Sequence, residues 1–292
     1  MSDVRTKPLT RAEVRQYHND GYLFPVRVLS DDQVVELREA IEDHLSGRIE
    51  SAKYELTDPI RIRRVAGQGG QVNFEYEDGE KSEPHTFPFL FNLWKSDERF
   101  AKVGMDPFIA GMARQLLGAA EVLLMEDNAV VKAPHSKRLP WHQDYSYWPL
   151  AEPAAITVWI ALDHITAANG AMQVIPGSHE LGERLPVSFG DARSLMYDER
   201  PGVKEVPQDP GAHGHKVVTY ELKPGECGFH SALVWHASTP NTSSSIRCAF
   251  ILRYLASGTI WLGAARFPYD DVGCTIGEPI GGAHFPAVAT AF

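Results

Sequence analysis

The sequence predicts a mainly β fold, an antiparallel sandwich or barrel with helices packed outside it. From residue 121 onward, short segments rich in β-branched and aromatic residues alternate with the turn signals "NG", "PGS" and "KPGE". "AITVWIALDHIT" and "IRCAFILRYLAS" are two of these segments. The lack of helical patterns between them argues against a parallel α/β sheet. We therefore expect antiparallel strands between about residues 121 and 256.

The part of the chain before these strands, about residues 10–118, carries helix signals. Capping boxes mark two helix starts, with Thr10 followed by Glu13 and Ser30 followed by Gln33. Apolar residues then recur at helical spacing. The predicted helices span about residues 10–20, 31–46 and 107–117.

Two long polar segments interrupt this pattern, residues 48–90 and 180–214. Residues 48–90 are too long for a simple connection and are expected to hold short strands or a lid. Residues 180–214 are expected to be a long excursion from the sheet and a second candidate lid. A C-terminal extension follows at 257–292. We expect the whole chain, residues 1–292, to form a single domain.

Composition excludes several classes of protein. The 292 residues carry a formal net charge of −10, which disfavours nucleic acid as a partner. The sequence contains neither a signal peptide nor an apolar run of about 18 residues, so we expect no membrane association. The three cysteines form no C-x-x-C pair, which argues against a disulfide framework or a thiolate zinc site. A cytoplasmic location is expected.

The stretch "WHQDYSYWPL", residues 141–150, contains the first candidate site residues. In a strand, residues i and i+2 face the same side, so His142 and Asp144 could converge on one point. An imidazole and a carboxylate are two thirds of the facial triad that binds non-heme iron(II). A surface pair, or an aspartate that orients a histidine, is the alternative interpretation, and a third ligand is needed to decide.

The stretch "FHSALVWHASTPNTSSSIR" offers this third ligand. His230 and His236 are six residues apart and could share one face of one strand. Arg247 stands eleven residues beyond His236, and its guanidinium is suited to a bidentate grip on a carboxylate. The alternatives are a buried, hydrogen-bonded core histidine at 236 and a surface arginine on a strand edge at 247.

Three motifs in order, "WHQD", "VWIALD…NGAMQVIPGSH" and "PGECGFHSALVWHASTPNTSSSIR", resemble the phytanoyl-CoA dioxygenase family of iron(II)- and 2-oxoglutarate-dependent oxygenases. The similarity extends over roughly residues 10–265. It implies a double-stranded β-helix, which is a cupin-like jelly roll. It also implies Fe(II), 2-oxoglutarate as cosubstrate and O₂, with hydroxylation of a small-molecule C–H bond and release of succinate and CO₂.

The resemblance also implies roles for single residues. His142 and Asp144 match the first two iron ligands and are expected on one strand or its exit. His236 matches the third ligand, which we expect across the barrel from them. His236 is preferred to His230 because only His236 has a serine two residues later and an arginine eleven residues later. His230 is expected to be hydrogen-bonded elsewhere within the barrel. Because relatives that halogenate carry Gly or Ala at the position of Asp144, oxygenation is the expected chemistry.

The cosubstrate contacts follow from the same resemblance. Arg247 is expected to bind the distal carboxylate of 2-oxoglutarate with help from Ser238, Trp159 to line the pocket, and Asn128 to add a contact. Some relatives also use an upstream lysine, which the corresponding residues 85–94 lack.

The substrate side is less defined by the sequence. Tyr145, Tyr147 and Trp148 follow the ligand pair and are expected to rim the mouth. Each could contact a small-molecule substrate or face the core as an ordinary strand residue. Two alternative functions are a non-catalytic metal- or ligand-binding jelly-roll protein and a cupin-like metalloenzyme that does not use 2-oxoglutarate. The sequence predicts no oligomeric state.

Overall fold

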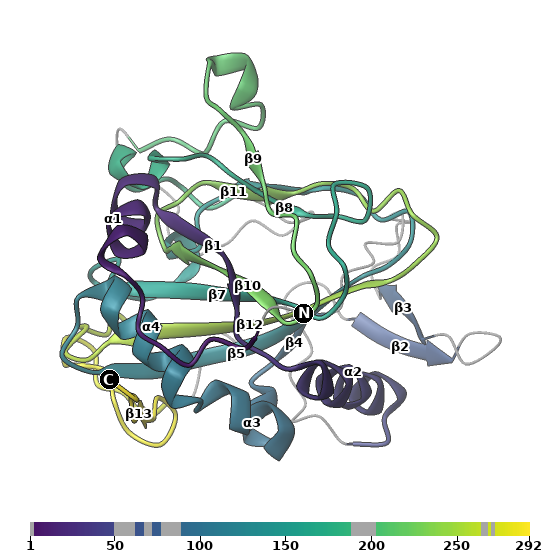
Figure 1. Cartoon of the computed structure of the whole chain (residues 1–292), viewed down its shortest axis with the longest axis horizontal. Helices are drawn as coiled ribbons and strands as arrows, with labels where there is room; N and C mark the ends of the chain where they lie inside the picture. Colours follow the sequence, from purple (N-terminus) through teal and green to yellow (C-terminus); the bar gives the residue numbers. More distant parts are fainter. Residues whose placement is uncertain are drawn as a thin grey trace.

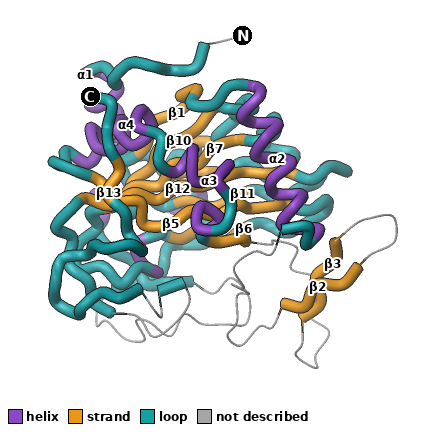
Figure 2. The backbone as a smooth tube through the Cα atoms, turned by 90° about the horizontal axis from the view of Figure 1, so that it is seen from below, coloured by secondary structure: helices purple, strands orange, loops and turns teal. Residues whose placement is uncertain are grey.

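Two antiparallel β-sheets face each other, and helices cover the outer face of the larger one (Figures 1 and 2). The computed structural model describes residues 3–49, 62–66, 72–76, 89–187, 203–263, 268–269 and 272–292. The mainly β jelly-roll fold predicted from the sequence is confirmed. Every ladder between named strands is antiparallel in the described part of the chain, including those between residues 121 and 256.

The large sheet has the order β1-β10-β7-β12-β5-β13, with β4 also paired to β5. Its strands are β1 (Tyr22–Arg27), β4 (Phe89–Phe91), β5 (Val122–Lys132), β7 (Ala155–Ala161), β10 (Glu226–Ser231), β12 (Arg247–Ala256) and β13 (Ala287–Val288). The small sheet has the order β6-β11-β8-β9. Its strands are β6 (Leu139–His142), β8 (Met172–Val174), β9 (Val218–Thr219) and β11 (His236–Ser238).

The three predicted helices are confirmed as α1 (Arg11–Asp20), α2 (Asp31–Ser46) and α4 (Pro107–Leu117). Both capping boxes are formed, with Thr10 paired to Glu13 and Ser30 paired to Gln33. Neither β1 nor the seven-residue helix α3 (Glu98–Gly104) was predicted from the sequence, since both are too short to show a clear period. No helix among the described residues is long and apolar enough to cross a bilayer.

The two long segments are described in part. Residues 62–66 and 72–76 form the separate hairpin β2-β3, so the prediction of short strands within residues 48–90 holds there (Figure 2). The rest of 50–88, and residues 188–202 of the second segment, lie outside the described residues. The remainder of the second segment contains the 3₁₀ turns η4 (Ser178–Leu181) and η5 (Gly211–His213).

Side chains of the large sheet alternate between two environments. On β12, Cys248, Phe250 and Leu252 belong to the cluster that includes the helices, whereas Ala249 and Ile251 pack with Met172 of β8 in the small sheet. The strand period of two residues therefore separates an outer apolar core from the interior between the sheets. Several polar side chains on these strands, among them Glu126, Asn128 and Arg253, lie on the interior face, where a site can form.

Two cross-strand rows organise this interior face. The strand registers place Glu126, Arg253, Thr157 and His230 side by side across β5, β12, β7 and β10, and we call these four residues the carboxylate row. A second row lies two residues further along each strand, roughly 7 Å away. We call it the middle row, and it consists of Asn128, Ile251, Trp159 and Gly228. Further along, Lys132 pairs with Arg247, and we call these two residues the cation pair.

Gly228 of the middle row gives a test of this packing. A Cβ at this position would lie 2.2 Å from Cε2 of Tyr220, whose ring is fully buried in the interior. Gly228→Ala should therefore lower the free energy of unfolding by about 1–3 kcal/mol through overpacking. Chemical denaturation of the variant and the parent protein measures the difference.

Gly281→Ala is the matched control, because a Cβ at Gly281 meets nothing within 4 Å. Its effect should stay within about 0.5 kcal/mol. A Gly228→Ala protein as stable as the Gly281→Ala protein would contradict the described packing of Tyr220 against β10.

Candidate metal centre

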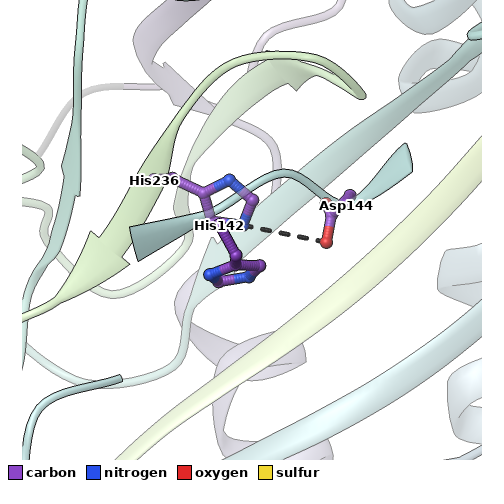
Figure 3. A group of neighbouring side chains, drawn as sticks. All are labelled: His142, Asp144 and His236. Atoms are coloured by element: carbon purple, nitrogen blue, oxygen red, sulfur yellow. Dashed lines mark ion pairs between the residues drawn. The ribbon is translucent and has the colours of Figure 1, made fainter. Parts of the chain in front are cut away.

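Three buried side chains converge at one end of the small sheet: His142, Asp144 and His236 (Figure 3). His142 is the last residue of β6, and His236 is the first residue of β11. Asp144 precedes the 3₁₀ turn η3 (Tyr145–Tyr147). One ligand atom from each of the three residues lies within 4.8 Å of the others, so the group could hold a metal ion.

The route by which these residues meet differs from the prediction. His236 is not across the barrel from His142; it is the direct cross-strand partner of His142 in the same sheet, and the two ring centroids are 4.0 Å apart. The spacing within the sequence could not reveal this pairing. Asp144 lies at the exit of the strand, as the prediction allowed, because its backbone is already helical at φ −64° and ψ −41°. A turn, and not the strand period, brings the carboxylate to the imidazoles.

Backbone carbonyls orient both imidazoles. Nδ1 of His142 is 2.8 Å from the carbonyl oxygen of Pro140, and Nδ1 of His236 is 3.1 Å from that of Val234. A carbonyl only accepts, so each Nδ1 donates and each neutral ring keeps the Nε2 lone pair for a metal. Burial lowers the pKa of His142 to about 4 and holds that of His236 well below its usual range. Both rings are therefore neutral at pH 7.

The carboxylate row holds Asp144. Oδ2 accepts a hydrogen bond of 2.7 Å from Oγ1 of Thr157 and lies 3.3 Å from Nε2 of His230. Oδ1 lies 3.4 Å from Nη2 of Arg253 and 3.7 Å from Nε2 of His236. With Oδ2 occupied by two partners, Oδ1 is the oxygen directed at the imidazoles, and binding through one oxygen leaves more coordination positions open.

Charge around Asp144 keeps it ionised. Burial acts to raise the pKa of Asp144, but the Arg253 guanidinium, His236 and His230 outweigh it and hold this pKa well below the usual range. Arg253 is held in turn by an ion pair with Glu126, whose other oxygen accepts a 2.6 Å hydrogen bond from Tyr269. The C-terminal extension is thereby linked to the metal centre.

His230 is a support of this site in the described geometry. It lies on β10 of the large sheet, so the idea that it shares one strand with His236 is wrong; a turn separates the two strands. The prediction that His230 is hydrogen-bonded within the barrel is confirmed by its contact with Asp144.

Arg247 forms a second polar feature of the interior. It is 3% exposed, so the alternative of a surface arginine is wrong. Nη2 donates to the carbonyl oxygen of Gly170 over 2.9 Å, and the guanidinium carbon lies 5.2 Å from the centre of the Trp159 ring. Nε and Nη1 are buried without a hydrogen-bond partner in the described structure. Burial lowers the pKa of Arg247 to about 10, so it remains a cation at pH 7 with donors ready for an anion.

The other predicted cosubstrate residues lie in the same interior. Ser238 is buried on β11, two residues after His236, and accepts a 2.8 Å hydrogen bond from Nζ of Lys132. Trp159 and Asn128 both belong to the middle row. Asn128 is buried, and neither its Nδ2 nor its Oδ1 has a hydrogen-bond partner in the described residues. Unsatisfied buried amides of this kind are rare without a ligand or water.

The three predicted substrate residues follow Asp144 and are largely enclosed. Tyr145 and Trp148 are buried in one apolar cluster with residues of the C-terminal extension. Trp148 also faces Arg253, whose guanidinium carbon is 5.5 Å from the ring centre. Tyr147 is partly exposed, and its hydroxyl both donates to the carbonyl of Val187 and accepts from its N–H, over 2.7 and 2.9 Å. Of the three residues, Tyr147 therefore fits the predicted rim position best.

Both ends of the segment 180–214 are tied to the ligand-bearing strand. At its start, Gln143 donates to the carbonyl of Gly182 and accepts from the N–H of Arg184. At its end, the Gln208 side chain makes reciprocal hydrogen bonds with the backbone of Trp141. The described ends of the segment are therefore both bound to residues adjacent to His142 in the sequence.

Sequence reasoning missed several residues that the structure brings to the site. The charged or polar ones are Glu126, Lys132, Thr157 and Arg253, all on strands of the large sheet. A signal was available, because "FILRYLA" and "NAVVKAP" each place one charge within an otherwise apolar strand. A charge buried in a sheet must find a partner or a ligand.

The sequence profile of the phytanoyl-CoA dioxygenase (PhyH) family matches residues 17–249 of this chain. The chain belongs to this family. Among curated proteins, it is similar to L-proline trans-4-hydroxylase of Streptomyces griseoviridis, with 28% identity over 85% of this chain and 86% of the relative. The family predicted from the three sequence motifs is thereby confirmed.

Solved structures share the fold of this chain. The chain resembles SnoK, a non-heme alpha-ketoglutarate-dependent carbocyclase from nogalamycin biosynthesis, with a TM-score of 0.69, 24% identity and 96% of each chain covered. It also resembles EctD from S. alaskensis, solved with 2-oxoglutarate and 5-hydroxyectoine. That match has a TM-score of 0.61 and 22% identity, and covers 87% of this chain and 79% of EctD.

The geometry predicts a clear order of metal retention. His142→Ala, Asp144→Ala and His236→Ala should each reduce bound iron(II) to background, because each removes one of three ligand atoms. His230→Ala should weaken iron(II) binding by roughly 10–100-fold, since it removes only one support of Asp144 while Thr157 remains. An anaerobic iron(II) titration of all four variants, with a protein-bound iron assay, makes the comparison. Retention of iron by the His236→Ala protein together with its complete loss from the His230→Ala protein would reverse our assignment.

Proposed function

We propose that this protein is an iron(II)- and 2-oxoglutarate-dependent oxygenase that hydroxylates a C–H bond of a small-molecule metabolite and releases succinate and CO₂. One observation carries the proposal. Two buried features share the interior between the sheets: a group of two neutral histidines and one ionised aspartate, and an arginine with unused donors. The first suits a divalent metal, and the second suits a carboxylate.

The donor set fits iron(II). His142, Asp144 and His236 would hold the ion, and two imidazoles with one carboxylate form the facial arrangement that leaves positions for cosubstrate and O₂. When bound, iron(II) with 2-oxoglutarate supplies the oxidising chemistry in which O₂ is consumed, 2-oxoglutarate yields succinate and CO₂, and oxygen enters the substrate.

The protein's own contribution is orientation and exclusion of water. The carbonyls of Pro140 and Val234 fix the two imidazole tautomers, and Thr157 fixes one oxygen of Asp144. None of these ligands needs to move a proton at pH 7, because the imidazoles are neutral and the carboxylate is ionised. Burial of all three strengthens their interactions and keeps bulk water from the reacting atoms.

Arg247 would bind the distal carboxylate of 2-oxoglutarate through Nε and Nη1. Ser238 would add a hydroxyl donor, Trp159 a flat apolar wall, and Asn128 a further hydrogen bond. Arg247, Ser238 and Asn128 have 3%, 6% and 1% of their surface exposed, so the carboxylate would be bound away from water, where ionic hydrogen bonds are strong.

The substrate is proposed to be a small molecule that enters near Tyr147, with Tyr145 and Trp148 behind it. The similar L-proline trans-4-hydroxylase acts on a small molecule by its name, which supports this size class. The net charge of −10 supports the absence of nucleic acid or acidic membrane surfaces among the partners. We also propose that residues 1–292 work as a single domain and that the protein is cytoplasmic.

A screen for succinate formation tests the proposal. Protein loaded anaerobically with iron(II) is mixed with 2-oxoglutarate, O₂ and a library of metabolites, and succinate and hydroxylated products are measured. Substrate-dependent succinate in amounts equal to hydroxylated product is the expected result. Binding of iron(II) and 2-oxoglutarate with no succinate would favour a non-catalytic binding protein. Oxidation of a substrate without any 2-oxoglutarate would favour a cupin-like metalloenzyme.

Arg247 gives the most direct mutational prediction. Arg247→Ala leaves the bound carboxylate buried and unpaired, which should cost roughly 3–5 kcal/mol in cosubstrate binding. This corresponds to a rise of about a hundredfold or more in the apparent 2-oxoglutarate requirement. Arg247→Lys should recover only part of the loss, because a point charge cannot reproduce the planar guanidinium.

Iron content should remain unchanged in both Arg247 variants, since Arg247 is not part of the His142, Asp144 and His236 group. The measurement is a titration of 2-oxoglutarate against succinate produced, alongside an iron assay. An Arg247→Ala protein with the parent's 2-oxoglutarate dependence would refute the cosubstrate assignment.

A further inference from the structure

Arg253 is a buried cation that two carboxylates share unequally. Its Nη1 forms a close ion pair with Oε1 of Glu126, whereas its Nη2 lies 3.4 Å from Oδ1 of Asp144, the oxygen directed at the imidazoles. Nε of Arg253 is buried without a hydrogen-bond partner in the described part of the chain. The guanidinium therefore binds Glu126 tightly and Asp144 only loosely, although it has a donor left over.

A tighter contact between Arg253 and Asp144 is chemically available. Nε–H and one N–H of Nη2 lie on the same edge of a guanidinium, and this edge suits a carboxylate. Arg99 binds Asp97 in this way elsewhere in the protein, with Nε and Nη2 both donating to the carboxylate over 2.7 to 3.1 Å. An Arg253 released from Glu126 could close on Asp144 similarly, and it would then occupy the oxygen that a metal needs.

The large sheet and the C-terminal extension both hold Glu126 in place. The register of β5 with β12 shifts directly after Arg253, which leaves Met125 as a bulged residue beside Glu126. Met125 packs in one apolar cluster with Tyr269, whose hydroxyl donates a 2.6 Å hydrogen bond to Oε2 of Glu126. Burial raises the pKa of Tyr269 well above its usual range, so this hydroxyl keeps its proton and remains a donor. One oxygen of Glu126 is thus fixed by Arg253 and the other by Tyr269.

We propose that Glu126 and Tyr269 are positioning residues of the metal centre: Glu126 holds Arg253 back from Asp144, and Tyr269 fixes Glu126 in the position that does so. The metal-directed oxygen of Asp144 is thereby left for iron(II). Charge acts in the same direction, because the two carboxylates and one guanidinium leave one negative charge in excess, and this excess disappears without Glu126. The inference rests on the proposed function and gives two residues a role that neither the sequence motifs nor the comparisons assign.

The iron(II) affinity of substituted proteins tests the inference. Metal-free parent and Glu126→Gln proteins are titrated anaerobically with iron(II) alone, and protein-bound iron is measured. Glu126→Gln keeps the shape of the side chain and removes its charge, so Arg253 loses its close partner and turns to Asp144. Iron(II) binding should weaken by about 10–100-fold, the range for losing a support of a metal ligand.

A second substitution separates the release of Arg253 from a general disturbance of the site. Adding Arg253→Met to Glu126→Gln removes the competing guanidinium and restores the excess negative charge, now on Asp144. Iron(II) affinity should return to within about fivefold of the parent's, since removing both partners of a buried pair costs far less than removing one. Damage to the fold predicts the opposite order, because the double variant loses more contacts than the single one.

Tyr269→Phe tests the other half of the proposal. It should weaken iron(II) binding by about tenfold, the lower end of the same range, because Glu126 keeps its ion pair with Arg253. Tyr254→Phe is the matched control. The Tyr254 hydroxyl is also buried, but it donates over 2.9 Å to the carbonyl of Gly104, and its ring packs in the outer core with the helices. Its removal should leave iron(II) affinity unchanged, and thermal melting of the metal-free proteins should show that both tyrosine variants are folded.

Three results would overturn the inference: parental iron(II) affinity in the Glu126→Gln protein, a double variant that binds iron(II) no better than Glu126→Gln, or equal affinities of the Tyr269→Phe and Tyr254→Phe proteins. If Glu126→Gln alone does not fold, the affinity of the double variant and the comparison of the two tyrosine variants still decide. The proposed function fails in another way, since the parent protein would then bind no iron(II) or would bind it without ever forming succinate.

Discussion

Burying charge between the two sheets is the constraint on which the rest of this structure depends. At one end of the interior, the carboxylates of Asp144 and Glu126 share the single guanidinium of Arg253, which leaves an excess of negative charge. At the other, Arg247 and Lys132 place two basic groups side by side. The protein balances the charge at each end only in part. Because a buried charge without a counter-charge is costly, each end favours a ligand of opposite charge. A metal cation has the charge that would balance the negative end, and the cosubstrate carboxylate has the charge that would balance the positive end.

The sheet architecture makes this separation possible. Alternate residues of β5, β7, β10 and β12 face outward into a largely apolar core with the helices, and that core contributes hydrophobic burial. The inward residues are then free to be polar at fixed cross-strand positions. Rigid strands hold the supports of Asp144, while the small sheet holds the two imidazoles. Function therefore depends on the registers of both sheets.

Local features could be predicted from the sequence, and long-range pairings could not. Features contained within a few residues can be recognised from the sequence. Examples are the capping boxes at Thr10 and Ser30 and the ligand pair His142 and Asp144. The cross-strand meeting of His236 with His142 depends on strand order. The supports Arg253 and Tyr269 depend on packing over more than a hundred residues from Asp144 and Glu126. Lys132 was not predicted for the same reason, since only the pairing of β5 with β12 places it opposite Arg247.

The measurement that tests this account most directly is a crystal structure of the protein grown anaerobically with iron(II) and 2-oxoglutarate. The account predicts iron held by Nε2 of His142, Nε2 of His236 and one oxygen of Asp144, with the second oxygen still bound to Thr157. It predicts the distal carboxylate of 2-oxoglutarate against Arg247, within the interior between the sheets. Iron ligated by His230 in place of His236, or a cosubstrate carboxylate directed away from Arg247, would contradict it.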